Sequence, residues 1–341
     1  MAELRYNPIT QDWLMVASHR QSRPQLPKDW CPFCVGSGKV PDGGFDVYRY
    51  PNDFPALSAE PPVPDDVAAS ELFMTEPAYG RCEVLLYADR HNVKLSDLTD
   101  DHVHKLARMW LEVFNDFSND PKIKYVFIFE NRGEVVGVTM PHPHGQAYGY
   151  PFIPRVIREE LAGAGKYYKD TGNCLFCELL AQERKDKRRI IRENEYFTLY
   201  TPFYAQTAYA THITAKRHVE NITQMTDMEL DALGEIVRDA SAMYDQLFNM
   251  PFPYMMCMHN APVSVVCTNA PSGGDPSYSA YFHFHIEFIP PMRAADKQQF
   301  FASSETGAGA WCNPTCPEEK AEELKAAMLR VDDIRQAHDM R

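Results

Sequence analysis

The chain has 341 residues, of which 45% are hydrophobic and 24% are charged, an ordinary composition for a globular protein. Its length suggests about two domains. The net charge of −13 argues against a nucleic-acid-binding surface, but allows one phosphorylated small molecule held by a few local donors. No apolar run approaches the ~20 residues that span a bilayer, and the first residues lack the layout of a signal peptide. We therefore expect a cytoplasmic protein that binds neither nucleic acid nor membrane.

Nine cysteines in a chain without a secretory signal indicate reduced thiols rather than a disulfide framework. Four of them form two Cys-x-x-Cys pairs, Cys31 with Cys34 and Cys174 with Cys177. The other five form no comparable pattern, and we expect them to be small buried or half-buried residues.

The segments that follow the two cysteine pairs resemble each other, which indicates an internal repeat. In the first half a basic residue and His91 precede a stretch that ends in Thr99-Asp100. The second half has the same order, with His218 and Thr226-Asp227. Each Thr-Asp pair supplies an N-cap for a pattern of apolar residues at three- and four-residue steps. The expected helices cover 103–117 and 230–247.

Each half continues with strand-like sequence and a His-x-His motif. The strand-like stretches are 125–129 and 281–288, and the motifs are His142-Pro143-His144 and His283-Phe284-His285. Strands interrupted by one long helix predict an α+β fold of two tandem halves, each a mainly antiparallel sheet with a long helix. Small residues at 162–165 are expected to mark a break, which gives predicted domains of 1–165 and 166–341. A third helical pattern, over 321–334, should pack onto the body.

Each half offers four candidate metal ligands. Two thiolates three residues apart hold one ion from a tight turn, and two histidines complete the tetrahedral shell of Zn²⁺. The sets are Cys31, Cys34, His91 and His142 in the first half, and Cys174, Cys177, His218 and His283 in the second. Because four protein ligands close the shell, we expect one or two structural zinc ions per chain. The alternative is two reduced cysteine pairs beside ordinary histidines.

His144 is the candidate nucleophile. Residues two apart on an extended strand point to the same face, so His142 can bind metal while His144 stays in a cleft. Pro143 stiffens their relation, and Gly145 leaves room for the close approach of a phosphate. Gln146 adds an amide that can donate to a phosphoryl oxygen. A neutral imidazole attacks activated phosphorus, so we predict covalent catalysis rather than a hydrogen-bonded core histidine.

The hexapeptide Pro141-His142-Pro143-His144-Gly145-Gln146 resembles the active-site motif of the galactose-1-phosphate uridylyltransferase family, in the histidine triad superfamily. The similarity extends over nearly the whole chain, including 7–23, 50–55 and 129–133. The resemblance implies a UDP-glucose–hexose-1-phosphate uridylyltransferase. By resemblance, His144 attacks the α-phosphorus of UDP-glucose and releases glucose 1-phosphate, Gln146 stabilises the uridylyl-histidine, and galactose 1-phosphate then takes the uridylyl group.

The resemblance also implies substrate contacts. Arg20 and Arg23 fit phosphate charge, with a solvated basic turn as the alternative. Asn52 and Asp53 would hold uridine or ribose hydroxyls, with simple turn chemistry as the alternative. Asn131, Phe300 and Glu305 match further substrate-contacting positions, although Gln299 stands where well-known members carry Lys. The family is typically dimeric, with each active site completed by the partner chain, so the resemblance implies a homodimer.

Some members of the family carry a second metal bound by a Glu and three His. The matching positions are Glu160, His259, His283 and His285. Because His283 cannot serve both sets, we favour the cysteine-containing set, since thiolates bind zinc tightly. Iron is the alternative ion at the second site. Glu287 stands where the first half has Gln146, so we expect no second active site.

Two other functions compete with the transferase. One is a nucleoside-diphosphate-sugar phosphorylase, such as an ADP-glucose phosphorylase, which shares the fold, the two zinc sites and the histidine nucleophile. Gly145 favours the transferase, because phosphorylases of this branch tend to have Ser there. The other is a zinc-stabilised nucleotide-binding protein without turnover, which would form no covalent intermediate.

Overall fold

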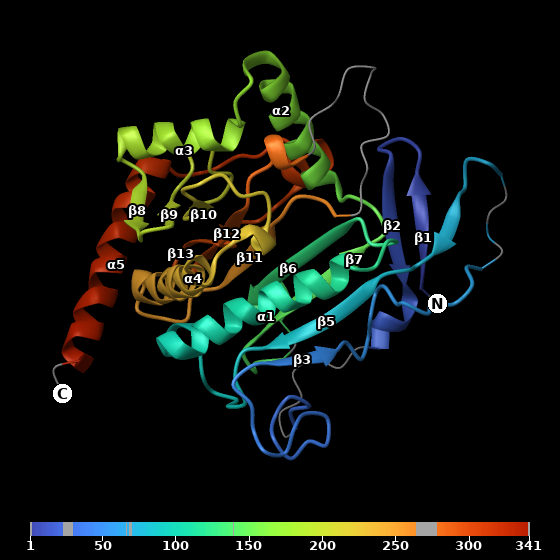
Figure 1. Ribbon diagram of the computed structural model, residues 1–341, viewed down its shortest axis with the longest axis horizontal. Helices are drawn as coiled ribbons and strands as arrows, with labels where there is room; N and C mark the ends of the chain where they lie inside the picture. The colour runs from blue at the N-terminus through green and yellow to red at the C-terminus, as the bar shows by residue number, and fades with distance from the viewer. Residues whose placement is uncertain are drawn as a thin grey trace.

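One antiparallel sheet of nine strands carries both halves of the chain (Figure 1). This is seen in a computed structural model that describes residues 2–22, 30–65, 67, 70–138, 140–263 and 278–339. In sheet order, the strands are β3 (Tyr48–Pro51), β5 (Arg81–Leu86), β7 (His144–Tyr150), β6 (Tyr125–Arg132), β11 (Tyr254–His259), β12 (His285–Ile289), β10 (Thr211–Ala215), β9 (Phe197–Tyr200) and β8 (Ile190–Glu193).

The internal repeat is visible in the strand order. Strands β3, β5, β7 and β6 of the first half are mirrored by β9, β10, β12 and β11 of the second. The two sets meet where β6 pairs with β11, with Glu130 opposite Met256. This confirms the predicted α+β fold with mainly antiparallel halves, and adds that the halves share one sheet. Joining them satisfies backbone groups that two separate half-sheets would leave unpaired at these edges.

Two long helices cover one face of this sheet (Figure 1). Helix α1 (Asp100–Ser118) and helix α4 (Asp227–Leu247) pack against each other. Both begin where the sequence predicts, because the side chain of Thr99 accepts from the His102 amide and Thr226 forms a capping box with Glu229. The helix predicted over 321–334 is also confirmed: α5 (Pro317–Asp339) packs on α4 and β8.

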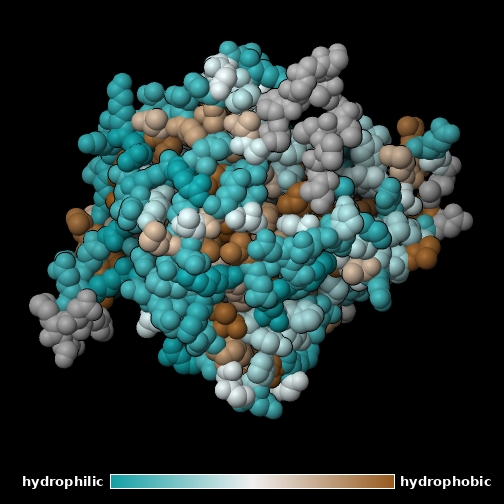
Figure 2. Space-filling model, in the orientation of Figure 1, coloured by the Kyte–Doolittle hydropathy of each residue, from teal (hydrophilic) through white to brown (hydrophobic). Residues whose placement is uncertain are grey.

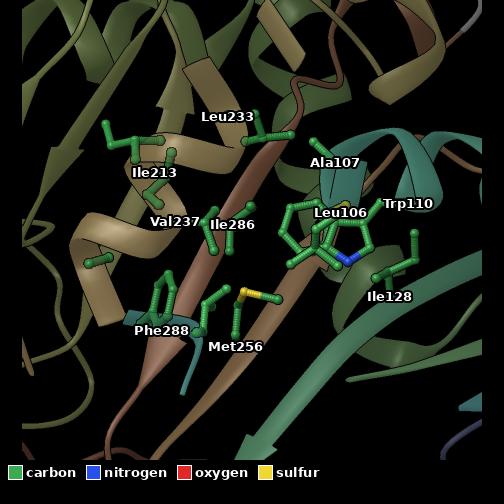
Figure 3. Close-up of a cluster of buried hydrophobic side chains, with 14 of the residues drawn as sticks. Leu106, Ala107, Trp110, Ile128, Ile213, Leu233, Val237, Met256, Ile286 and Phe288 are labelled. Carbon is green, nitrogen blue, oxygen red and sulfur yellow. The ribbon is translucent and has the colours of Figure 1, made fainter. Parts of the chain in front are cut away.

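The core lies between these helices and the sheet (Figure 3). Trp110 of α1 and Val237 of α4 are fully buried there. The sheet contributes aliphatic, thioether and aromatic side chains from both halves, including Ile128, Ile213, Met256, Ile286 and Phe288. Because one core includes both halves, α1 and α4 hold the sheet rigidly behind its opposite face, where the candidate sites lie.

Smaller elements surround this body. They are β1 (Ala2–Asn7), β2 (Asp12–Ala17) and β4 (Thr75–Pro77), which form a three-stranded sheet, the hairpin of β13 (Met292–Ala294) and β14 (Lys297–Gln298), and the helices α2 (Arg155–Thr171) and α3 (Leu175–Asp186). The face in Figure 2 is mostly hydrophilic, with hydrophobic residues in small separate groups. No helix among the described residues has the length and apolarity to cross a membrane.

Three local predictions are wrong. Cys312 and Cys316 are exposed, although the sequence predicts buried or half-buried cysteines outside the two pairs; Cys82 is buried, Cys257 is half-buried, and Cys267 lies outside the described residues. The expected break at 162–165 lies inside α2, because Ile157, Leu161 and Ala164 bury one helical face and outweigh the cost of about 1 kcal/mol per helical glycine. The strand expected over 281–288 begins only at His285, and residues 278–280 form a short 3₁₀ turn.

Candidate active site and metal-binding groups

Strand β7 places alternate side chains on opposite faces of the sheet. His144, Gln146 and Tyr148 lie on the face turned away from α1 and α4, and all three line one cavity there. The helix-facing positions of β7 hold only glycine or alanine, because Tyr87 packs closely against Gly145, and Phe117 and Ile123 pack closely against Gly149. A Cβ on Gly145 would lie 2.3 Å from the Tyr87 hydroxyl oxygen. The missing side chain at 145 therefore makes room for a core tyrosine, not for phosphate as the sequence suggested.

The backbone fixes the tautomer of His144. Its Nδ1 lies 2.7 Å from the carbonyl oxygen of His142, and a carbonyl only accepts, so Nδ1 carries the proton. In the neutral ring the lone pair is then on Nε2. The ring of Phe33 lies 5.7 Å from the His144 ring, centroid to centroid, and restricts its position. The candidate nucleophile is thus oriented by both backbone and packing.

The cavity around His144 has a volume of about 240 Å³ and brings four predicted site residues together. Arg20, on a short 3₁₀ helix (Ser18–Ser22), reaches it and donates to the Tyr148 hydroxyl at 3.3 Å. The lining residues are Arg20, Phe129, Asn131, Gly137, Val138, His144, Gln146 and Tyr148. Tyr148 is a lining residue that was not predicted from the sequence, although its position four residues after His144 on one strand places both on the same face.

Asn52 and Asp53 do not line this cavity. The Asn52 side chain accepts from the Phe54 amide at 2.9 Å, which is the turn chemistry weighed as an alternative. Asp53 accepts from the Tyr50 hydroxyl at 2.9 Å and from Lys39 at 2.6 Å. Phe33 lies between the two regions, with its ring 5.4 Å from Tyr50 and 5.7 Å from His144.

The remaining substrate residues lie elsewhere. Arg23 falls outside the described residues. Phe300 is 74% exposed, and Glu305 lines a different cavity of about 660 Å³ over the second half. Neither lines the cavity around His144 of the same chain.

The first four-ligand group fits a tetrahedral zinc ion. The Nδ1 atom of His91 lies 3.3 Å from the Cys34 sulfur, and that of His142 lies 3.7 Å from Cys34 and 3.8 Å from Cys31. Tetrahedral zinc with ordinary bond lengths holds sulfur and nitrogen about 3.5 Å apart. His142 directs Nε2 to the Ala88 carbonyl at 2.7 Å, which leaves Nδ1 as the ligand atom.

The second group repeats this geometry. The Cys177 sulfur lies 3.3 Å from Nδ1 of both His218 and His283. Both rings direct Nε2 to backbone carbonyls, that of Ser279 at 2.7 Å and that of Ala215 at 2.9 Å. With Cys174, these donor atoms all lie within 4.8 Å of one another. The structure thus groups His283 with the cysteines, as favoured from the sequence.

A third group contains only nitrogen and oxygen donors, from Glu160, His259, His285 and Glu287. His283 does not belong to it, and Glu287 takes the fourth corner. Burial lowers the pKa of His285 to about 4, so this ring is neutral. Burial opposes charge on His259, but Glu160 and Glu287 raise its pKa to about 9. The Oε2 atom of Glu160 is buried and has no hydrogen-bond partner among the described residues, which fits a site for a cation.

The fold and the histidine-centred cavity define an α+β protein of two related halves, in which a histidine, an arginine and a glutamine line one cavity. Comparisons with known proteins narrow this class. The model of the galactose-1-phosphate uridyl transferase N-terminal domain matches residues 34–154, and that of the C-terminal domain matches 160–338. The chain belongs to the galactose-1-phosphate uridylyltransferase family.

Similar proteins agree over almost the full length. The galactose-1-phosphate uridylyltransferase of Thermotoga maritima is 38% identical over 97% of this chain and 100% of its own. That of Rattus norvegicus is 30% identical over 94% and 86%. A solved uridylyltransferase structure has a TM-score of 0.83 and 31% identity, covering 96% of this chain and 99% of its own. An ADP-glucose phosphorylase of Arabidopsis thaliana, with 24% identity and a TM-score of 0.72, shares the fold.

Proposed function

We propose that this chain exchanges UMP between UDP-glucose and galactose 1-phosphate through a uridylyl-histidine on His144. One observation carries the proposal: the hydrogen bond of 2.7 Å from Nδ1 to the His142 carbonyl leaves the lone pair of the neutral ring on Nε2. Arg20 and Gln146 line the same cavity, so a nucleophile and two donors meet in one place. This is the arrangement that covalent catalysis at phosphorus requires.

In the first half-reaction, Nε2 of His144 attacks the α-phosphorus of UDP-glucose. The N–P bond forms as the bond from phosphorus to the oxygen of glucose 1-phosphate breaks, and that oxygen takes the electron pair. The leaving group departs as a phosphate ester, which is a weak base and needs no strong general acid. The ring becomes cationic, and its Nδ1–H bond to the His142 carbonyl strengthens as the charge develops.

In the second half-reaction, a phosphate oxygen of galactose 1-phosphate attacks the same phosphorus. The N–P bond breaks, the electron pair returns to Nε2, and UDP-galactose leaves. The Arg20 guanidinium and the Gln146 amide donate to the phosphoryl oxygens in both steps. Because one nucleophile serves two similar leaving groups in turn, the kinetics are ping-pong.

The substrates extend beyond the cavity around His144. Its volume of about 240 Å³ is below the roughly 300–1,000 Å³ of pockets that enclose a whole ligand. We place uridine toward Asn52 and Asp53, beyond Phe33. We place the hexose against Phe300 and Glu305 of the partner subunit in a homodimer, since these residues lie away from His144 of their own chain.

We infer zinc in both groups of two cysteines and two histidines. There it would fix the loops that flank the motif, and because its shell is closed it takes no part in the chemistry. The third group has no thiolate, and its two carboxylates and two imidazoles suit a harder ion such as iron. Elemental analysis of protein purified without chelators should find two zinc ions per chain, and finding none would contradict this inference.

The test of the reaction is to incubate the protein with UDP-glucose labelled in the uridylyl group and without a second substrate. We expect one acid-labile uridylyl group per chain and an equal amount of released glucose 1-phosphate. His144→Ala should form none, whereas His104→Ala should react like the parent, because His104 pairs with Glu235 of α4 at 2.8 Å and does not line the cavity around His144. An adduct that persists in His144→Ala, or no adduct in the parent, would refute the mechanism.

Two further arms separate the competing functions. UDP-glucose with galactose 1-phosphate should give UDP-galactose at least about 100-fold faster than ADP-glucose with phosphate gives ADP. The opposite ranking would identify a phosphorylase. Nucleotide binding without any adduct would identify a binding protein.

A further inference from the structure

Tyr87, the residue after β5, contacts the histidine motif on both sides of His144. Its N–H donates to the Pro143 carbonyl at 3.0 Å. Its buried side chain lies under Gly145, where a Cβ would be 2.3 Å from the hydroxyl oxygen and 3.1 Å from Cζ. One tyrosine therefore contacts the residue before and the residue after the candidate nucleophile.

Glu130 lies beside Tyr87 under the same strand. Because Phe129 pairs with Gln146, Glu130 falls opposite Gly145, on the helix-facing side of the sheet. Its Oε1 accepts from the Tyr254 hydroxyl at 3.0 Å. Its Oε2 and the Tyr87 hydroxyl are both buried, and the two side chains interact, since burial raises the pKa of Tyr87 and the neighbouring Glu130 adds to that rise. Burying such polar groups is unfavourable, but other buried polar atoms of this protein also have no partner among the described residues, so burial alone does not assign a role to this pair.

The second half provides an internal comparison. Extending the sheet register of each half by one residue gives three matched pairs of positions: Tyr87 with Ala215, Glu130 with Met258, and Gly145 with Ile286. All three residues of the second half are apolar and buried. The residue on the strand is large where the first half has glycine, and the residue beneath it is small where the first half has tyrosine. The fold therefore does not need the polar pair, which accompanies only the half with the nucleophile.

We propose that Tyr87 and Glu130 are positioning residues for His144, which occupy the space beneath Gly145 and hold the backbone that aims Nε2. This inference rests on the proposed function of His144. All three residues contribute to the lining of one cavity of about 250 Å³ beside the motif. In this arrangement glycine is required at 145 because any side chain would displace the Tyr87 hydroxyl.

The test is a double-mutant cycle of Gly145→Ala and Tyr87→Phe, with single-turnover release of glucose 1-phosphate by excess enzyme as the readout. A displacement of about 1 Å costs about 100-fold in rate, so we expect Gly145→Ala to be about 100-fold slower, with little change in the KM for UDP-glucose. Removing the hydroxyl relieves the 2.3 Å contact. The double variant should therefore be about 10-fold faster than Gly145→Ala, a coupling expected only of residues in contact.

Gly149→Ala is the matched control, because it lies on the same strand and face but five residues after His144. Its Cβ would meet Ile123 at 2.6 Å. We expect lower stability and an unchanged rate per folded molecule. A double variant no faster than Gly145→Ala, or a Gly145→Ala variant at the parental rate, would overturn the proposal.

If Gly145→Ala fails to fold, Tyr87→Phe alone tests the proposal. This change adds no atoms and leaves a gap under Gly145, so we expect a rate about 10-fold lower because the backbone that aims Nε2 is held less firmly, with the zinc content unchanged. A parental rate would overturn the proposal. Failure of the proposed function is distinguishable, because the parent itself would then form no uridylyl adduct.

Discussion

Replacing Glu130 by Gln should make stability less dependent on pH. Burial raises the pKa of Glu130 to about 7 from its ordinary 4.5, while Arg132 on the same strand, Tyr254 and Tyr87 oppose this rise and Asp245 of α4 adds to it. Between pH 4.5 and about 7, Glu130 is therefore mostly protonated in the folded protein and mostly ionised in the unfolded chain. The parent accordingly loses stability as the pH rises from about 4.5 to about 7.

The size of the effect follows from this interval. The difference between 4.5 and about 7 corresponds to about 3 kcal/mol, at about 1.4 kcal/mol per pKa unit. Gln keeps the shape and one acceptor but does not titrate. The free energy of unfolding of Glu130→Gln, minus that of the parent, should therefore increase by up to about 3 kcal/mol between pH 4.5 and pH 8.

Urea unfolding of both proteins at a series of pH values measures this difference, with the zinc content checked at each pH so that metal loss does not contribute. The difference should rise between pH 4.5 and 7 and then become constant. A difference independent of pH, or one that falls as the pH rises, would refute the assignment of a buried, protonated carboxyl to this position.

Three other perturbations test the remaining site and fold. Cys31→Ser should reduce bound zinc from two ions to one per chain by elemental analysis, and retention of both would contradict the ligand set. Arg20→Ala should lower kcat/KM for UDP-glucose about 10- to 100-fold, the value of one charge-assisted hydrogen bond, and a change below about twofold would exclude phosphate contact. Thr226→Ala should lower the free energy of unfolding by about 1 kcal/mol through loss of the capping box, with kcat unchanged; equal urea midpoints would contradict this.

The helices could be predicted because their signals are local. Apolar residues at three- and four-residue steps mark α1 and α4, and Thr99 and Thr226 mark their starts. The pairing of β6 with β11 carries no such signal, because edge-to-edge contact between distant strands leaves no period in either one. Gly163 and Gly165 suggested a break for a similar reason: the apolar face of α2 that stabilises the helix around them is recognised only when its packing partners are known.

The candidate site could likewise be predicted only in part from the sequence. His142, His144 and Gln146 are adjacent in sequence and carry reactive groups, so the motif could be recognised. Tyr148 could also have been predicted, because alternate residues of an extended strand lie on the same face. Tyr87 could not be found, because it packs where residue 145 has no side chain, and glycine at 145 is compatible with several explanations until the atom beneath it is known.

The two halves finally show what the repeat determines and what it leaves to individual residues. In both, the second histidine of the motif directs Nδ1 to the carbonyl of the first, at 2.7 Å for His144 and 2.9 Å for His285. The shared fold thus orients this histidine ring in the same way in both halves. Arg20 and the neutral amide of Gln146 lie near His144, and these donors favour an anionic phosphate. Around His285 stand two carboxylates, which repel that anion and favour a cation. We therefore propose that the charge of the neighbouring residues, on one shared fold, makes His144 a nucleophile and His285 a metal ligand.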